Sequence, residues 1–375
     1  MSYTMEEYAR MLADPVRGSA YLAAVRESVR PGAVVADIGA GPGVLGIYAA
    51  TLGARRVFLV DPDASVNAAR ALAIENGVED RVEIIRARST EIELPERADV
   101  IVSDLRGVTP FHGSHLESAA DIRRRLLAPG GTCIPLRDRV HVALVEDGAL
   151  YARTVGAWCG VPAPLAHESL TSLMANGWFR ARVTGQQLLS ESSPLVTLDY
   201  ERTAPPLHVS WNACATRDGT AHGILLWFDT DLTASISLSN APDAPPALYG
   251  QAFFPFRPAI TLHRGESLRL ELRAVRSGDD YAWSWSARAE DGRSARHTTL
   301  LALPLDPAAL VLRAERSAPR RSSEGEVLRT LLDAADGRAT FGDLARLLHE
   351  RFAARFPTMQ SALDYVTSVD DLWAR

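Results

Sequence analysis

The stretch that decides the fold is Val34-Val35-Ala36-Asp37-Ile38-Gly39-Ala40-Gly41-Pro42-Gly43, which is followed by Val57-Phe58-Leu59-Val60-Asp61. Both stretches begin with an apolar run, and such runs are typical of parallel strands that are covered on both faces. The glycines allow a tight turn whose backbone approaches a ligand closely, and Asp61 at the tip of the second strand can accept hydrogen bonds from two ribose hydroxyls. The pattern therefore predicts a strand, a turn, a helix and a second strand around an adenosine-containing cofactor.

The identity of that cofactor depends on Asp37. The spacing Gly41-x-Gly43-x-x-Gly46, with Asp61 further on, matches the pattern of NAD sites. However, a carboxylate directly before the turn would repel a pyrophosphate, whereas it suits the ammonium and sulfonium end of S-adenosylmethionine. We therefore expect a methyltransferase that converts S-adenosyl-L-methionine to S-adenosyl-L-homocysteine. A NAD site and a strand–turn–helix without a ligand are the alternatives.

Composition limits the other classes of function. The chain has 375 residues, 47% hydrophobic and 23% charged, which is typical of a soluble protein with two or three domains. Its net charge of −6 argues against a general nucleic-acid binder, although it leaves room for a local basic patch. No apolar run is long enough for a membrane span and the first thirty residues lack the apolar core of a signal peptide, so we expect a cytoplasmic protein without a membrane partner.

Cysteine and lysine usage exclude further chemistry. Cys133, Cys159 and Cys214 lack the spacing of metal ligands, so we expect free thiols and no metal site. The chain contains no lysine, which excludes Schiff-base and pyridoxal-phosphate chemistry.

Hydrophobic periodicity predicts a doubly wound α/β domain over residues 1–135. Residues 5–30 are expected to be helical. The alternating elements that follow are expected as a strand at 34–38, a helix at 43–52, a strand at 57–60, a helix at 63–76, strands at 82–86 and 99–103, and a helix at 115–127. The sequence Ala128-Pro129-Gly130-Gly131 is expected to form a turn that leads into another strand.

The second half of the chain has a different texture. Residues 136–315 contain short β-rich runs separated by turns, which predict an antiparallel β-barrel or sandwich. Residues 151–181 interrupt this pattern and are expected to form a helical arm. After a polar linker, residues 323–375 are expected to form a small helical module.

The chain resembles the protein arginine methyltransferase family over roughly residues 5–313. Met11-Leu12-x-Asp14-x-x-Arg17-x-x-x-Tyr21 resembles the family's cofactor-lid helix, and Glu83–Pro95 resembles the segment that holds the adenine. Asp99–Asp104 resembles the strand that leads into the catalytic loop. Later matches are Leu127–Pro135, the strands at 190–199 and 222–229, and Tyr281–Trp285. The resemblance implies a Rossmann-like domain followed by a β-barrel, and a homodimer formed through the arm.

The resemblance also implies a set of cofactor contacts. Arg17 would pair with the cofactor carboxylate, a bidentate task that suits a guanidinium, and Ser89 and Thr90 would lie beside the adenine. The predicted cofactor-binding residues are Met11, Arg17, Asp37, Gly39, Gly41, Gly43, Leu45, Asp61, Pro62, Ser89, Thr90 and Asp104.

The chain departs from the family in its catalytic loop. Arginine methyltransferases grip the substrate guanidinium with two glutamates, and these positions correspond here to Asp104 and Gly113. The barrel loop that supplies a threonine, a histidine and a tryptophan in the family has Ala247-Leu248-Tyr249 instead. Since a guanidinium is held best by two carboxylates, methylation of peptidyl arginine is disfavoured.

These departures favour N-methylation of an amine on a small molecule or on a peptide natural product, including a ribosomally made one. Asp104 would anchor the amine, and His112, His115 or Tyr249 would accept its proton or orient it. The alternatives are O- or C-methylation, true arginine methylation, and a non-catalytic relative that only binds the cofactor. The module at 323–375 resembles the helical half of domains that recognise the leader peptides of such products, so a peptide substrate is one expectation.

Overall fold

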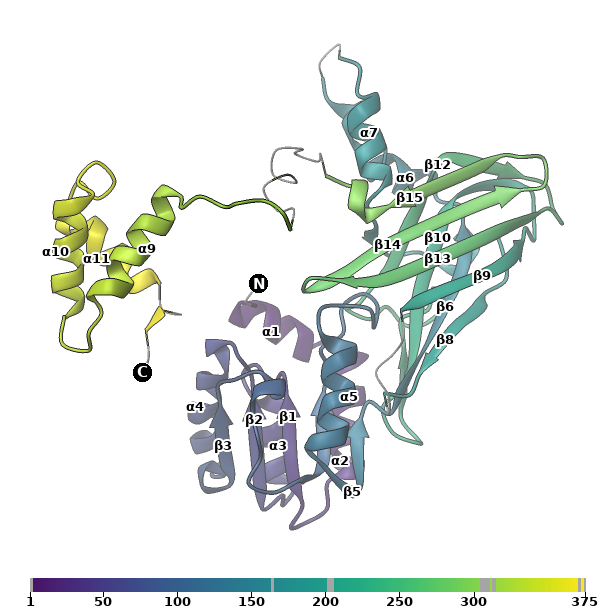
Figure 1. Ribbon diagram of the computed structural model, residues 1–375. Coiled ribbons are helices and arrows are strands. Elements are labelled where there is room, and N and C mark those ends of the chain that lie inside the picture. Colours follow the sequence, from purple (N-terminus) through teal and green to yellow (C-terminus); the bar gives the residue numbers. More distant parts are fainter. Residues whose placement is uncertain are drawn as a thin grey trace. The chain divides into compact units, whose positions relative to one another are not determined.

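The computed structural model describes residues 3–162, 165–200, 206–303, 311, 315–369 and 372–373. The chain divides into two compact units, Met1–Pro304 and Leu305–Arg375, and each is considered by itself (Figure 1). None of the helices in the described ranges is long and apolar enough to cross a membrane.

A five-stranded parallel sheet forms the first part of the larger unit, in the order β3-β2-β1-β4-β5. Its strands are β1 (Val34–Ile38), β2 (Arg56–Val60), β3 (Val82–Ile85), β4 (Ala98–Ser103) and β5 (Leu127–Ile134). Every residue of β1 is buried, as its apolar sequence requires for a central parallel strand. The predicted doubly wound class is confirmed.

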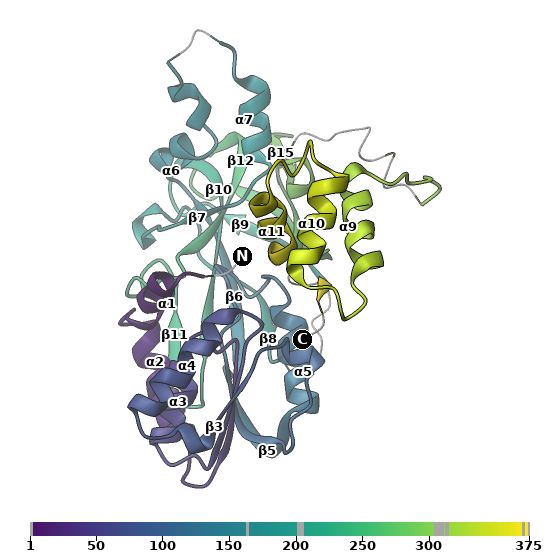
Figure 2. The ribbon, with the colours of Figure 1, turned by 90° about the vertical axis from the view of Figure 1, so that its left-hand side faces the viewer.

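Helices cover both faces of this sheet. They are α2 (Arg17–Ser28), α3 (Val44–Thr51), α4 (Ala68–Glu75) and α5 (His115–Arg125), with short 3₁₀ turns η1 (Ala64–Asn67), η2 (Glu79–Arg81) and η3 (Ser89–Glu91). A further helix, α1 (Met5–Leu12), lies beyond the ends of the strands (Figure 1). Figure 2 shows α3 and α4 on one side of the strands and α5 on the other. Alternate residues of β2 accordingly enter two separate cores: Val57 packs with α3, and Phe58 packs with Ile122 of α5.

Two of the expected elements differ in kind from the observed ones. The predicted helix at 5–30 is broken after Leu12, because the Asp14 carboxylate accepts the backbone N–H groups of Val16 and Arg17 and so begins α2 anew. The predicted turn at 128–131 lies inside β5, where the register against β4 shifts and Gly130 takes a φ of 77°.

Two antiparallel sheets complete the larger unit. One has six strands in the order β7-β12-β10-β6-β8 with β11 beside β10, and the other has the order β15-β14-β13-β9. The strands are β6 (Arg137–Val145), β7 (Phe179–Ala181), β8 (Ser193–Leu198), β9 (Leu207–Cys214), β10 (Gly219–Asp231), β11 (Ser237–Ser239), β12 (Gln251–Leu262), β13 (Ser267–Ser277), β14 (Asp280–Ala289) and β15 (Ser294–Thr298). Their inward residues share one core, with Trp285 and Phe254 in a T-shaped contact. The predicted barrel or sandwich class is confirmed.

Short helices interrupt this β domain where the arm was expected. They are α6 (Gly148–Arg153), the 3₁₀ turn η4 (Ala157–Gly160) and α7 (Glu168–Ala175); two further 3₁₀ turns are η5 (Gly185–Gln187) and η6 (Thr299–Leu301). Asp147 caps α6 by accepting the N–H of Leu150.

The smaller unit contains α9 (Ser323–Ala334), α10 (Phe341–Arg351) and α11 (Met359–Ser368). Each begins at a hydroxyl N-cap, which is Ser322, Thr340 or Thr358 in turn. The three helices bury a common apolar core that includes Leu331, Leu348 and Val366.

Candidate active site

The glycine turn after β1 lies at the carboxyl edge of the parallel sheet, where α/β proteins bind ligands. Gly39, Gly41 and Gly43 have φ values of 74°, 52° and 80°, a region that favours glycine. A Cβ on Gly41 would lie 2.4 Å from the ring of Tyr8 of the lid helix α1. The turn therefore brings bare backbone close to this edge, as a nucleotide cradle requires.

Two buried carboxylates flank the turn. Asp37 accepts the Gly46 N–H at 2.9 Å, and burial raises its pKa to about 7. Asp61, at the tip of β2, accepts the Gly41 N–H at 2.8 Å and the Asp63 N–H at 2.8 Å, and burial raises its pKa as well. Buried acids of this kind gain from a cationic ligand and from hydroxyl donors, which fits S-adenosylmethionine.

The remaining predicted cofactor residues line the same edge. Ser89 is buried in η3, and its carbonyl accepts Nη2 of Arg125, whereas Thr90 is exposed. Pro62 follows β2, and its carbonyl accepts Nε of Arg86. Leu45 is buried in the first turn of α3.

Arg17 joins the lid to the catalytic loop. It is the first residue of α2, and its Nε donates to Oδ2 of Asp104 at 2.7 Å while Nη1 donates to the carbonyl of Met11. Its Nη2 makes no hydrogen bond within the described chain, so one donor edge remains for the carboxylate that the resemblance assigns to it.

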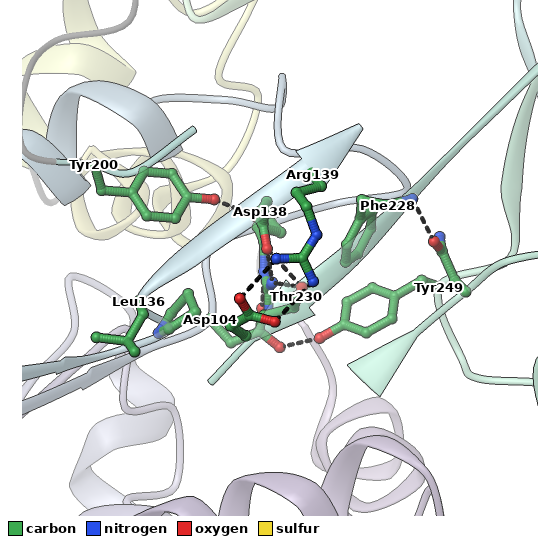
Figure 3. Close-up of polar contacts among 12 residues, drawn as sticks. Asp104, Leu136, Asp138, Arg139, Tyr200, Phe228, Thr230 and Tyr249 are labelled. Atoms are coloured by element: carbon green, nitrogen blue, oxygen red, sulfur yellow. Dashed lines mark hydrogen bonds and ion pairs between the residues drawn. The ribbon is translucent and has the colours of Figure 1, made fainter. Parts of the chain in front are cut away.

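Asp104 is held between two guanidinium groups. Besides Arg17, Arg106 donates from Nε to Oδ1 of Asp104 at 3.0 Å. Tyr249 donates its hydroxyl to Oδ2 at 2.5 Å (Figure 3). Burial opposes ionisation, but Arg106 and Arg17 outweigh it and hold the pKa of Asp104 below its usual range. The carboxylate is therefore charged at neutral pH.

Arg106 continues this network into the β domain. Its Nη1 donates to Asp138 at 2.7 Å and to Thr230 at 2.5 Å, and its Nη2 donates to the hydroxyl of Tyr21 at 2.5 Å. The side chains of Arg106 and Asp138 are completely buried. Figure 3 shows Asp138 of β6 and Thr230 of β10 beside Asp104. We call Arg17, Asp104, Arg106 and Asp138 the ion-pair cluster.

The two loop histidines lie in different surroundings. His115 is buried at the start of α5, 3.1 Å from the hydroxyl of Tyr200, which in turn donates to Asp138. Burial lowers the pKa of His115 to about 3, so its ring is neutral at pH 7, and its Nδ1 has no hydrogen-bond partner among the described residues. His112 is exposed and packs beside Gly107.

Tyr249 lies against Phe228 of β10, with ring centroids 5.2 Å apart in a T-shaped contact. Burial, together with Asp104, raises the pKa of Tyr249 well above its usual value. The phenol therefore keeps its proton and acts as a donor to Asp104.

Gly113 is the residue that the resemblance places at the family's second glutamate, and a guanidinium lies against it. The carbonyl of Gly113 accepts Nη1 of Arg276, and its N–H donates to Asp280 at 3.3 Å. Nε of Arg276 is also 3.6 Å from Oε1 of Glu117. This end of the loop is thus tied to the hairpin of β13 and β14.

Sequence reasoning did not assign Arg106, Asp138, Thr230 or Tyr200 to the site. The signal for Arg106 was its position two residues after Asp104, in the loop that carries the predicted catalytic residues. Asp138 lies on the inward side of β6, next to the outward Arg137 and Arg139, so alternation alone could have placed it inside.

Comparison with known proteins identifies the family. Residues 137–289 match the model of the arginine methyltransferase oligomerization subdomain, and residues 19–106 match that of ribosomal protein L11 methyltransferase. An arginine N(omega)-methyltransferase of Streptomyces achromogenes subsp. streptozoticus is 31% identical over 271 residues, which cover 70% of this chain and 74% of that protein. The chain belongs to the protein arginine methyltransferase-like family of S-adenosylmethionine-dependent methyltransferases.

Other members of this family are similar to the chain. Protein arginine N-methyltransferase 1 of Schizosaccharomyces pombe is 28% identical over 274 residues, which cover 70% of this chain and 79% of that protein. A probable histone-arginine methyltransferase of rice is 30% identical over 75% of the chain, but the match covers only 58% of its own length.

Solved structures of the family share the fold. The Trypanosoma brucei PRMT1 enzyme–prozyme complex superimposes with a TM-score of 0.72 at 23% identity, covering 79% of this chain and 98% of that chain. Protein arginine methyltransferase 10 of Arabidopsis thaliana gives 0.67 at 22% identity, covering 79% and 98%. S-adenosylmethionine, the cofactor of this family, fits the glycine turn at 39–43 together with Asp37, Asp61 and Arg17.

The titration of Asp37 predicts how stability depends on pH. The folded chain holds a proton on Asp37 up to a pKa of about 7, whereas an unfolded aspartate loses it near pH 3.9. The free energy of unfolding therefore falls as the pH rises between these values. Asp37→Asn removes this loss, so it should raise Tm at about pH 8 more than at about pH 5, as measured by thermal unfolding.

The same variant should bind S-adenosylhomocysteine more weakly by calorimetry, because an amide cannot pair with the cofactor's ammonium group. Equal changes in Tm at both pH values would show that Asp37 does not titrate in this range.

The ion-pair cluster predicts a large effect of Arg106→Met. This change leaves Asp138 buried without its guanidinium, and breaking a buried ion pair costs about 3–5 kcal/mol. Urea unfolding measures the loss. Arg137→Met is the matched control, since the exposed pair of Arg137 with Asp231 should contribute about 0–1 kcal/mol.

Adding Asp138→Asn to Arg106→Met should restore part of the lost stability, because the amide needs no counter-ion. If Arg106→Met destabilises no more than Arg137→Met, the cluster does not support the fold as described.

Proposed function

We propose that this methyltransferase transfers the methyl group of S-adenosylmethionine to the nitrogen of an amine, on a small molecule or a peptide natural product, rather than to peptidyl arginine. The observation that carries the proposal is the hydrogen bonding of Asp104. An ionised carboxylate offers about four acceptor sites, and Arg17, Arg106 and Tyr249 already use three of those of Asp104.

The remaining acceptor site suits one N–H group. It lies on Oδ1, which accepts only Nε of Arg106 among the described residues. A guanidinium substrate is gripped best through two parallel N–H bonds, and the position of the second family glutamate is Gly113, whose carbonyl is taken by Arg276. A single site on a charged carboxylate supports an amine acceptor instead.

The reacting nitrogen must present a free lone pair. When bound, the cofactor would supply a methyl group on a sulfonium, and transfer would form the N–C bond as the S–C bond breaks, leaving a thioether and a methylated ammonium. Asp104 would orient the amine through one N–H, which supplies alignment for an in-line displacement.

The other three predicted catalytic residues differ in what each can do at the site. Tyr249 keeps its proton and would orient Asp104. His115 is neutral and bonded to Tyr200, so it would hold the loop in place. His112 is exposed, which supports it as the group that passes the amine's proton to water.

Arginine is the second candidate acceptor. It is favoured by the name of the Streptomyces relative, an arginine N(omega)-methyltransferase at 31% identity. In that case Asp104 alone would hold the guanidinium.

We also infer a homodimer and a peptide-binding role for the C-terminal helices. The match of residues 137–289 to an oligomerization subdomain supports the dimer. A measurement of the molecular mass in solution tests it. The leader-peptide resemblance supports the second role, and truncation before Ser322 should then weaken peptide binding without changing cofactor affinity.

Mass spectrometry of the products tests the acceptor class. The protein is incubated with S-adenosylmethionine and either amine-bearing peptides and small molecules, or free arginine and arginine-rich peptides. We expect methylation in the amine set only. Methylation of arginine alone would contradict the amine proposal while leaving the cofactor assignment intact.

Asp104→Asn should lower kcat on the acceptor that is methylated by about 10²-fold, because an amide does not orient the reacting nitrogen as a carboxylate does. Tyr249→Phe should have a smaller effect, since Asp104 keeps both arginines. Binding of S-adenosylhomocysteine is measured in parallel, and full turnover by a cofactor-binding Asp104→Asn enzyme would exclude the anchoring role.

A further inference from the structure

The outer face of the sheet β15-β14-β13-β9 is unusually basic for an acidic protein. Alternation along β13 buries Leu268, Leu270 and Leu272 and turns the residues between them outward. Strands β13 and β14 run across the front of the β domain in Figure 1. We call the outward side of these four strands the basic face.

Four exposed arginines lie on the basic face: Arg269, Arg273, Arg288 and Arg296. None of them makes a hydrogen bond or an ion pair with another described residue. The strands carry two carboxylates on this side. Glu271 is 2.7 Å from Nε2 of His208, and Asp280 accepts the N–H of Gly113. The face therefore holds cations that the described chain does not neutralise.

Two of these arginines stand directly opposite each other. Arg269 of β13 is paired in register with Arg288 of β14. Like charges at directly opposed positions of neighbouring strands are destabilising. An anionic group from outside the chain would neutralise this pair directly, whereas water and salt only weaken the repulsion between the two arginines.

A hollow lies at the other end of the face. Its volume is about 440 Å³, and Arg273 and Arg296 contribute to its lining together with Leu300 and Leu301 of η6. Glu271 also lines it, and this carboxylate lies 2.7 Å from Nε2 of His208. These leucines are 61% and 48% exposed, which is unusual for residues next to a cavity. The hollow thus combines guanidinium groups with uncovered aliphatic surface.

The chemistry of the face favours a peptide over a nucleic acid. No Phe, Tyr or Trp occupies an outward position of these strands, and Trp285, which also lines the hollow, is only 2% exposed, so bases would find no stacking platform. The net charge of −6 also opposes the approach of a long polyanion. Carboxylates spaced along an extended segment, with aliphatic side chains between them, match both the arginines and the leucines.

We propose that the basic face binds an acidic peptide segment that carries aliphatic side chains. This proposal is independent of which acceptor is methylated at Asp104, because it rests only on arginines and leucines of the basic face and of the hollow beside it.

Fluorescence anisotropy on the full-length protein tests the proposal, with a labelled peptide of glutamate and leucine as the probe. The same peptide with glutamine in place of glutamate, and a labelled RNA duplex, are the comparison probes. We expect the glutamate peptide to bind, with an affinity that falls as salt is raised, and the glutamine peptide not to bind.

The variant R269Q/R273Q/R288Q/R296Q should weaken binding of the glutamate peptide by about tenfold or more, since four charge pairs are lost together. R30Q/R70Q is the matched control, because it removes two exposed arginines elsewhere and should change the affinity by less than about twofold. R288Q alone should raise or preserve Tm, which separates lost binding from unfolding.

Three outcomes would overturn the proposal. The first is that the glutamate peptide does not bind at low salt, and the second is that the quadruple variant and the wild type bind it with equal affinity. The third is that the RNA duplex binds more tightly than the peptide and that the quadruple variant abolishes this RNA binding.

Discussion

The buried contact between Arg106 and Asp138 is the interaction on which the site depends. It ties the loop after β4 to β6 and β10, so it fixes the parallel sheet against the β domain. Two buried charged groups are stable only when each has an oppositely charged partner and further hydrogen bonds. Thr230, Tyr21 and Asp104 supply those bonds to Arg106. The geometry of Asp104 is thus set by a network rather than by the loop alone.

This network also decides what Asp104 offers to a ligand. Arg106 places a resident guanidinium against one of its oxygens, while Arg17 and Tyr249 share the other. The carboxylate stays charged, but most of its acceptor capacity is used within the protein. A site with two free carboxylates binds a guanidinium through two parallel bonds, whereas this site has one charged group with one open position.

The sequence predicted the fold elements on the cofactor side of the site better than the contacts around Asp104. The strand–turn–helix around Asp37, the strand ending at Asp61 and the overall fold class follow from local patterns of apolar residues and glycines, and the fold and the family are confirmed. Arg106, Asp138 and Thr230 come together only through tertiary packing of segments far apart in the chain, which no local pattern encodes. The depressed pKa of His115 likewise follows from burial that its loop position did not reveal.

A crystal structure of the complex with S-adenosylhomocysteine tests the single-acceptor site at Asp104 most directly. We expect Asp104 to keep its contacts with Arg17, Arg106 and Tyr249, and its one open acceptor position on Oδ1 to face the cofactor sulfur. A second carboxylate moving into the loop beside Asp104, or Asp104 turned away from the sulfur, would contradict the single-acceptor site.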